Sequence, residues 1–245
     1  MAGHSKWANI QHRKARVDAA RGKLFTRLVK EITVAARLGG GDPDGNPRLR
    51  AAIQDARNSN VPNDNIDRAI KKGTGDLEGV AYEECTLEGY GPGGVAMLVE
   101  AVTDNRNRTV AEVRHLFSRA GGSLGESGCV AWMFERQGYF ALDPETMSEE
   151  QFMELALDLG ADDIETSDEA YEIYTSAEDY MRILEELEKR QIAVQSKDFA
   201  MVPNSTTELD EQKMASVANL VDTLEEHDDV QNVWFNADLP SDEEE

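Results

Sequence analysis

The sequence predicts a multi-domain protein that combines α and α+β parts. Residues 1–75 contain helical periods separated by glycine, proline and capping residues, and from residue 76 strand-like and helical runs alternate. Between residues 138 and 201 a complete β-α-β-β-α-β order appears, which is the ferredoxin-like plan. We therefore expect an N-terminal helical bundle (1–75), an α+β domain (76–136 plus 204–240), an inserted ferredoxin-like domain (137–203) and an acidic tail (241–245).

The N-terminal segment is predicted to form three helices. Residues 18–38 have a helical period that stops at three glycines. Asn46 followed by Pro47 is typical of a helix start, because asparagine caps free N–H groups and proline suits the first helical position. This second helix should run to about Asn60. Asn63 is expected to cap a third helix that ends at Gly73.

The next segment is predicted to begin the α+β domain with a hairpin. Strand-like runs at 82–87 and 95–103 are joined by a glycine-rich turn. Thr109 and Glu112 have the spacing of a capping box for a helix that runs to Ala120. A further strand is expected at 129–134.

The inserted unit is predicted from helix caps and short strands. Ser148 with Gln151, and Ser176 with Asp179, are expected to cap its two helices. Its strands are expected at 139–142, 164–167, 171–175 and 192–201. A last helix (208–226) and strand (230–235) have no partner in this unit, so we assign them to the α+β domain.

Charge is divided by position along the chain. Residues 1–75 carry 15 Lys/Arg against 7 Asp/Glu, a net charge of +8, whereas residues 76–245 carry 10 against 41, a net charge of −31. A cationic module attracts phosphate backbones, and an anionic body limits nonspecific contact with polyanions. The pattern predicts a nucleic-acid-binding protein whose contact is confined to its N-terminal end.

The positive charge of residues 1–75 is predicted to lie on helix faces opposite the apolar residues. On a helical wheel the cations of the first helix fall within ~80° of one another, with Val34 as an apolar misfit among them. The third helix repeats this arrangement. A solvated basic face is common on any helix, but two such helices together with a basic arm favour polyanion contact. The expected contact residues on these faces are Lys23, Arg27, Lys30, Arg37, Arg68, Lys71 and Lys72.

Two further groups are candidates for the same contact. The N-terminal arm mixes cations with an indole, a combination that grips phosphates and stacks on bases, although Trp7 could equally pack on the bundle. Arg106 and Arg108 follow a predicted strand, where phosphate contact and local salt bridges to Asp104 or Glu112 are both open. The candidates in the arm are Lys6, Trp7, Arg13, Lys14 and Arg16.

The sequence argues against several other classes of protein. The four histidines lack metal-ligand spacing, and the glycine-rich stretch 89–94 lacks the Lys-Ser/Thr of a P-loop. Cys85 and Cys129 are too few for a disulfide framework and are expected to be buried thiols. No apolar run approaches a membrane span, and no signal peptide is recognisable. We therefore expect a cytoplasmic, non-enzymatic protein with no cofactor, metal, membrane or small-molecule substrate.

Three segments of the chain resemble the YebC family of probable transcriptional regulatory proteins. They are residues 2–10 (AGHSKWANI) with 12–14 (HRK), residues 32–37 (ITVAAR) through 45–50 (GNPRLR), and residues 105–109 (NRNRT). The resemblance covers essentially the whole chain. It implies an N-terminal helical bundle and two α/β domains, with the ferredoxin-like one inserted in the other. It also implies a non-enzymatic regulator of gene expression. Some members have been treated as DNA-binding transcriptional regulators, and others, including mitochondrial relatives, act as translation factors.

Two functions are the main hypotheses. One is a DNA-binding transcriptional regulator that holds phosphates with little sequence specificity, because no helix carries the Asn/Gln/Arg cluster expected for reading base edges. The other is a ribosome-associated translation factor that binds ribosomal RNA and relieves stalled elongation. A protein-interaction adaptor with an acidic binding face is a third reading. A metal-dependent enzyme using Asp162, Asp163 and Glu165 is the fourth.

Overall fold

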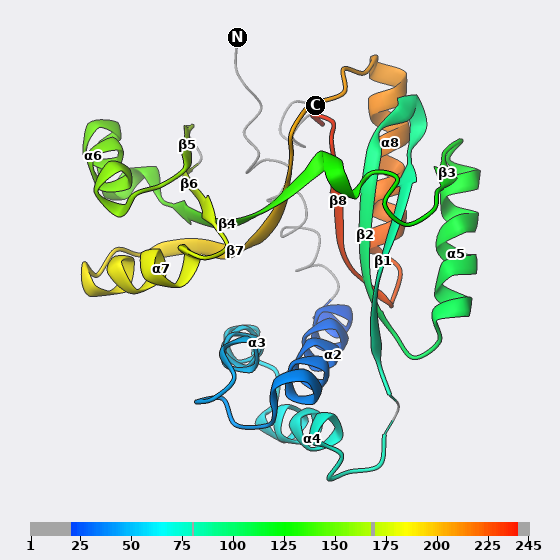
Figure 1. The fold of residues 1–245 in the computed structure, drawn as a ribbon, viewed down its shortest axis with the longest axis horizontal. Coiled ribbons are helices and arrows are strands. Elements are labelled where there is room, and N and C mark those ends of the chain that lie inside the picture. The colour runs from blue at the N-terminus through cyan, green and yellow to red at the C-terminus, as the bar shows by residue number, and fades with distance from the viewer. Residues whose placement is uncertain (1–20, 80, 168–169, 240–245) are drawn as a thin grey trace. The chain divides into compact units, whose positions relative to one another are not determined.

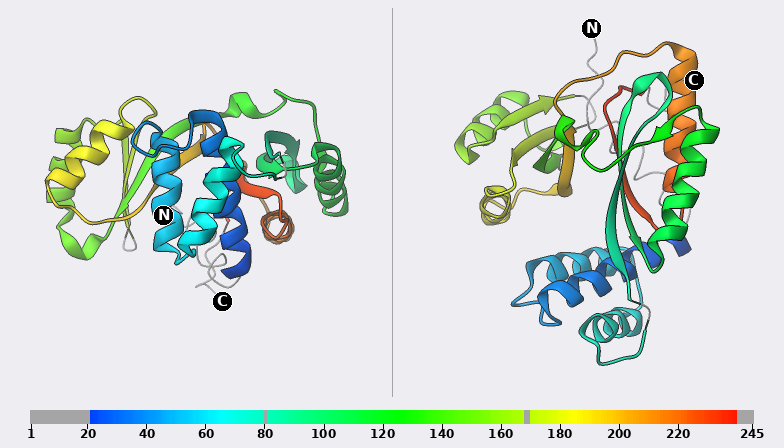
Figure 2. Two further views of the ribbon diagram at one scale, coloured as in Figure 1. Left: turned by 90° about the horizontal axis from the view of Figure 1, so that it is seen from below. Right: turned by 45° about the vertical axis from the view of Figure 1, so that its right-hand side comes forward.

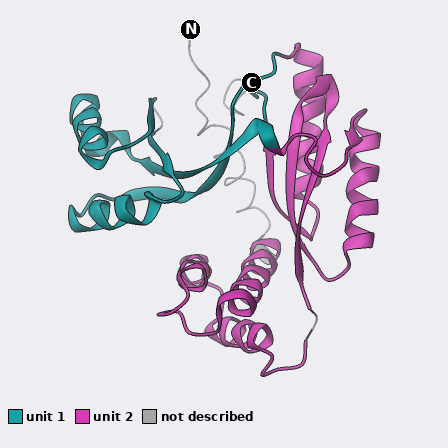
Figure 3. Ribbon diagram, viewed as in Figure 1, with its two compact units in different colours: residues 1–13, 132–208, 236–245 teal, residues 14–131, 209–235 magenta. Residues whose placement is uncertain are grey.

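The computed structural model describes residues 21–79, 81–167 and 170–239 (Figure 1). The described part has a mixed α+β fold with seven α-helices and two four-stranded antiparallel sheets. Contacts divide the chain into two compact units, one containing Trp132–Glu208 and the other containing the residues from 21 to 131 and Leu209–Phe235 (Figure 3). None of the described helices is long and apolar enough to cross a membrane.

Three helices follow one another at the start of the described chain and share one core. The asparagine cap predicted for the second helix is confirmed, because the Asn46 side chain accepts a hydrogen bond from the Leu49 N–H and Pro47 occupies the first turn. The core contains Ile32, Leu49 and Ile66, each at most 3% exposed. The helices are α2 (Arg21–Gly39), α3 (Pro47–Asn58) and α4 (Asn63–Thr74).

The ends of α4 differ from the prediction. The N-cap position is occupied by Pro62, with no side-chain cap, so Asn63 is the first helical residue instead of the cap. The helix ends at Thr74, and its C-cap residue Gly75 has a φ of 85°, in the left-handed region that favours glycine. Gly73, where the helix was predicted to end, lies inside α4, and α4 packs closely on α2 at this position. A Cβ at Gly73 would come within 2.7 Å of the Ala36 Cβ.

The first sheet has the strand order β3-β1-β2-β8. The predicted hairpin is confirmed as the antiparallel pair β1 and β2, and β8 pairs antiparallel with β2 although it comes near the end of the chain. Helices α5 and α8 contact each other and lie side by side on this sheet (Figures 1 and 2). The elements are β1 (Glu83–Tyr90), β2 (Ala96–Thr103), α5 (Arg106–Arg119), β3 (Ser123–Leu124), α8 (Glu211–Glu225) and β8 (Val230–Phe235).

Two predictions for this part of the chain were wrong. Helix α5 is capped by Asn105, which accepts a hydrogen bond from the Arg108 N–H, so Thr109 and Glu112 do not form a capping box. Thr109 is instead fully buried. The strand expected at 129–134 is a turn followed by the short 3₁₀ helix Ala131–Met133. Cys129 is only half-buried, whereas Cys85 is buried as expected.

The second sheet has the strand order β5-β6-β4-β7 with antiparallel neighbours. The capping box of Ser148 and Gln151 is confirmed. Asp179 occupies the N-cap position of α7 without a side-chain cap, and its N–H bonds the Ser176 hydroxyl. The elements are β4 (Phe134–Leu142), α6 (Glu149–Leu159), β5 (Asp163–Thr166), β6 (Tyr171–Ser176), α7 (Tyr180–Lys189) and β7 (Val194–Pro203).

Candidate nucleic-acid interface

Among the contact cations predicted on the first and third helices, the exposed ones lie on α4 and at the end of α2, and α3 adds the exposed Arg48, Arg50 and Arg57. Arg37, Arg68, Lys71 and Lys72 are exposed, whereas Lys23 and Arg27 are partly buried. On α4 the apolar side is buried as predicted, with Ile66 and Ala69 at 3% and 1% exposure. The acidic tail and the arm candidates Lys6, Trp7, Arg13, Lys14 and Arg16 lie outside the described residues.

Another cation of this region, Arg48 on α3, is engaged in ion pairs. Its Nε lies 2.7 Å from Glu31 Oε1 on α2, and its Nη2 lies 2.6 Å from Glu84 Oε1 on β1. The hydrogen bonds that Arg48 donates to both carboxylates raise the pKa of its guanidinium against the opposing effect of its burial. These bonds connect the helices to the first sheet and reduce the positive potential of α3.

Lys30 was predicted to belong to the exposed basic face of α2, and the structure corrects this. Its side chain is buried, and Nζ lies 2.8 Å from Asp229 Oδ1 and donates to the backbone oxygens of Val102 and Asp228. Val34, the apolar misfit of the helical wheel, is also buried at 3% exposure. This side of α2 is therefore a packing surface, which explains why an apolar residue lies among its cations.

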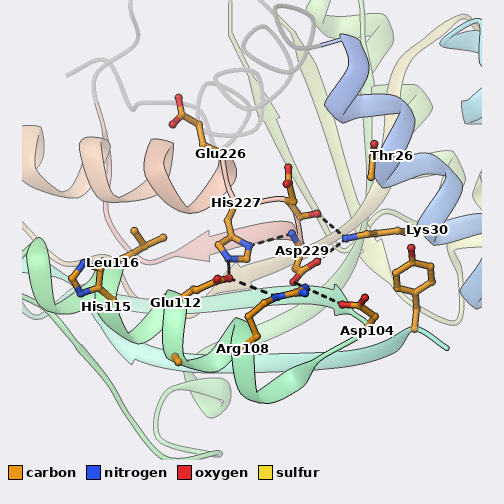
Figure 4. Close-up of a pocket in the computed structure, with 13 residues that line it drawn as sticks. Thr26, Lys30, Asp104, Arg108, Glu112, His115, Leu116, Glu226, His227 and Asp229 are labelled. Carbon is orange, nitrogen blue, oxygen red and sulfur yellow. Dashed lines mark hydrogen bonds and ion pairs between the residues drawn. The ribbon is translucent and has the colours of Figure 1, made fainter. Parts of the chain in front are cut away.

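Asp229 is the centre of the polar network that holds Lys30 (Figure 4). Its Oδ2 accepts hydrogen bonds from Arg108 Nη2 at 2.7 Å, Thr109 Oγ1 at 2.8 Å and Thr103 Oγ1 at 3.0 Å. Burial by itself would raise the pKa of Asp229, but the hydrogen bonds from Lys30, Arg108 and Thr109 outweigh it and hold that pKa far below its ordinary value. The carboxylate therefore stays ionised.

The two arginines at the start of α5 have different surroundings. Arg108 forms ion pairs with Asp104 at 2.9 Å and with Asp229. Of the two roles left open by the sequence, the structure shows the salt bridge to Asp104. Arg106 is exposed in the first turn of α5. A phosphate that approached Arg108 would compete with two carboxylates already in place.

The network lines a cleft of about 930 Å³ between α2, α5 and the turn before β8 (Figure 4). His227 lies in its wall, where its Nδ1 accepts the Asp229 N–H at 3.1 Å and its Nε2 lies 2.9 Å from Glu112 Oε2. The lining includes two permanent cations, Lys30 and Arg108. Its carboxylates are Asp104, Glu112, Glu226, Asp228 and Asp229. The excess of negative charge makes this cleft a poor site for a polyanion, so phosphate contact is expected outside it.

Sequence reasoning missed Asp229 and His227. Asp229 lies in a short acidic run before a strand, and its partners Lys30 and Thr109 are 199 and 120 residues away in sequence. Within the described residues no group of three or more His, Cys, Asp or Glu side chains is arranged to hold a metal ion, and this includes Asp162, Asp163 and Glu165. Nothing in the local sequence marked the pairing of Lys30 with Asp229.

Comparison with known proteins identifies the family. Residues 5–76 match the family described as TACO1/YebC protein N-terminal domain, and residues 82–237 match TACO1/YebC second and third domain. A probable transcriptional regulatory protein of Halothermothrix orenii is 55% identical, covering 98% of this chain and 96% of the relative. One of the same name from Syntrophobacter fumaroxidans is 52% identical, covering 98% and 97%. A crystal structure of a conserved hypothetical protein from Aquifex aeolicus matches with a TM-score of 0.88 at 49% identity, covering 98% of this chain and all of that one. The chain therefore belongs to the TACO1/YebC family.

Proposed function

We propose that this protein is a non-enzymatic, cytoplasmic regulator of gene expression that binds nucleic acid through its basic helical bundle. Relatives that match almost the whole chain are named probable transcriptional regulatory proteins, which supports a regulatory role. The observation that carries the binding proposal is the set of exposed cations on α4 and at the end of α2, opposite a buried apolar core. Such cations attract phosphates without reading base sequence. Its first candidate target is DNA.

We also propose the three-part organisation expected from the sequence. The family descriptions separate an N-terminal domain from a second and third domain, with the division between residues 76 and 82. The β-α-β-β-α-β order of β4 to β7 supports a ferredoxin-like part within 137–203. The pairing of β8 with β2 supports joining the last helix and strand to the α+β part that precedes the insertion.

Salt dependence of binding tests the basic-bundle proposal. Binding of a labelled DNA duplex should weaken steeply as salt rises, because each phosphate contact releases condensed counterions. Replacing Arg68, Lys71 and Lys72 together with glutamine should reduce the slope of log K against log salt by roughly 1 per lost contact. The matched control replaces three cations of the other unit, Lys189, Arg190 and Lys197, and should leave the slope unchanged. A flat salt dependence of the unaltered protein would contradict the proposal.

The alternative target is ribosomal RNA, which the distribution of charge also supports. A small cationic module on a body with a net charge of −31 suits a crevice lined by RNA, where only the module contacts phosphate. Deleting residues 2–14 should then remove the protein from ribosomal fractions while its circular dichroism spectrum stays the same. If the truncated protein sediments with ribosomes as well as the full chain does, the arm is not the contact.

A further inference from the structure

A small pocket lies where the C-terminal ends of α2 and α4 meet the segment that leads into β1. Its volume is about 360 Å³, within the ~300–1,000 Å³ typical of small-ligand sites. The residues that line it include Val34, Leu77, Ala81 and Tyr82. Arg37 and Lys72 line it as well, so two exposed cations from different helices converge on one place.

Both cations are held at the pocket by contacts of their own. Arg37 Nη1 donates to the Tyr82 backbone oxygen at 2.7 Å, which uses one of the five N–H groups of the guanidinium. The aliphatic stem of Lys72 passes close to Gly79, where an added Cβ would lie 3.1 Å from the Lys72 Cγ and Cδ. The guanidinium is therefore held at the pocket by the Tyr82 backbone, and the Lys72 stem lies against Gly79 in the pocket lining.

Part of the pocket wall is apolar and accessible. Leu77 is 41% exposed, whereas Val34 is buried at 3%. Tyr82 is partly buried and lines both the small pocket and the large cleft. Lys30 Nζ, which belongs to the large cleft, lies 5.5 Å from the Tyr82 ring centroid. A flat ring entering the pocket would cover Leu77 and gain contact with Tyr82.

The charge of this pocket differs from that of the large cleft. The small pocket has two cations and one carboxylate, Glu78, in its lining, whereas the large cleft has five carboxylates and two permanent cations. An anion is therefore favoured in the small pocket and disfavoured in the large cleft. The combination of an apolar wall with two converging cations matches a ligand that joins a flat ring to a phosphate.

We propose that this pocket binds one unpaired nucleotide of the nucleic acid, with the base against Leu77 and Tyr82 and its phosphate between Arg37 and Lys72. The inference rests on the proposed nucleic-acid binding and narrows its target to strands with an unstacked base. Single-stranded loops and bulges expose the flat face that stacking needs, whereas a perfect duplex hides it.

The test compares two labelled duplexes that differ by a single unpaired nucleotide, each made as RNA and as DNA. The protein should bind the bulged form about tenfold more tightly than the perfect duplex, because only the unpaired base is free to stack in the pocket. The RNA and DNA arms show which of the two nucleic acids supplies the nucleotide. Equal affinity for bulged and perfect duplexes in both arms would overturn the inference.

Matched variants assign the preference to the pocket. Leu77→Ser should lower the bulged-to-perfect ratio to near 1, whereas Leu38→Ser, at another exposed leucine that does not line the pocket, should leave the ratio unchanged. Lys72→Gln should also lower the ratio, while Lys71→Gln, its exposed neighbour outside the pocket, should weaken both duplexes equally. If Leu77→Ser and Lys72→Gln both keep the ratio of the unaltered protein, the pocket does not bind the base.

These outcomes are separable from failure of the proposed function. Salt-dependent binding of both duplexes with a ratio near 1 would leave the basic bundle in place and reject the nucleotide pocket. If none of the four nucleic acids binds in a salt-dependent way, the proposed function itself is rejected. Circular dichroism of Leu77→Ser and Lys72→Gln checks that a lost ratio reflects a folded variant.

Discussion

At the scale of single residues, the buried pair of Lys30 and Asp229 shows that a lysine of the helical region can hold two segments of the fold together. A buried ion pair contributes little net stability, but removal of one partner leaves a charge without compensation. Lys30 also donates to two backbone oxygens, so its position is fixed by three acceptors. The residue that looked like a nucleic-acid contact therefore connects α2 to the turn before β8.

Asp229→Asn should destabilise the protein by about 3–5 kcal/mol, because it leaves the Lys30 ammonium buried without a negative partner. The neighbouring exposed carboxylate offers a matched control, and Asp228→Asn should change stability by no more than about 0.5 kcal/mol. Urea unfolding followed by circular dichroism measures both. Equal stabilities for the two variants would show that the pair does not hold Lys30 in place.

The same carboxylate predicts a loss of stability in acid. The folded-state pKa of Asp229 lies well below its unfolded value of about 3.9, so its contribution to stability is complete above that value and is lost as pH falls toward the folded pKa. The urea midpoint of the unaltered protein should therefore fall as pH drops below about 4. Asp229→Asn should show a shallower fall over that range. Parallel pH profiles for the two proteins would assign the acid sensitivity to other groups.

At the scale of elements, structure that depends on neighbouring residues could be predicted from the sequence, whereas contacts between distant segments could not. The caps at Asn46 and Ser148 were predictable because each side chain bonds an N–H three residues away. Thr109 has the same local signal, yet its hydroxyl bonds Asp229, and Asn105 caps α5 instead. The basic face of α4 was predicted from its period. The burial of Lys30 and the pocket beside Arg37 depend on segments brought together only by the fold.

The close approach of α2 and α4 makes a prediction about Gly73. In an exposed helix interior, replacing glycine with alanine stabilises by about 0.5–1 kcal/mol. Here the new Cβ would lie 2.7 Å from the Ala36 Cβ and close to the Thr33 backbone oxygen, so Gly73→Ala should destabilise by about 1–3 kcal/mol. Gly45→Ala, where the nearest heavy atom is 3.9 Å away, is the control for thermal or urea unfolding. Stabilisation by Gly73→Ala would mean that the helices can separate at no cost.

A second element-scale prediction concerns the segment before the 3₁₀ helix Ala131–Met133. Glu88 on β1 is buried, and its carboxylate accepts N–H groups from Gly128 at 2.6 Å, Val130 at 2.9 Å and Ala131 at 2.8 Å. Burial raises its pKa, but these hydrogen bonds together lower it below the ordinary value. The bonds anchor the chain just before it leaves one compact unit for the other.

Glu88→Gln should speed amide hydrogen exchange at Val130 and Ala131, because a neutral acceptor replaces a charged one and charge-assisted bonds are roughly twice as strong. Glu126→Gln, which changes an exposed carboxylate a few residues away, should leave those exchange rates unchanged. Unaltered exchange in Glu88→Gln would show that the backbone of this segment is held by other contacts.

At the scale of the whole molecule, the separation of charge gives salt two opposite effects. The net charge of −31 over residues 76–245 produces repulsion that destabilises the folded state, and salt screens it. Salt also weakens exposed ion pairs such as that of Arg48 with Glu31, but such pairs contribute only about 0–1 kcal/mol each. Relief of repulsion should therefore be the larger effect on stability.

Raising salt from about 0.01 M to about 1 M, which shortens the Debye length from ~30 to ~3 Å, should raise the melting temperature of the free protein. Each kcal/mol gained corresponds to about 2–4 °C for a chain of this size. Over the same range the affinity for nucleic acid should fall, because counterion release then yields less free energy. Calorimetry of the free protein and binding titrations at matched salt measure the two trends. Because stability rises while binding falls, weaker binding at high salt cannot come from unfolding. A melting temperature that falls as salt rises would contradict the conclusion that charge repulsion is the larger effect.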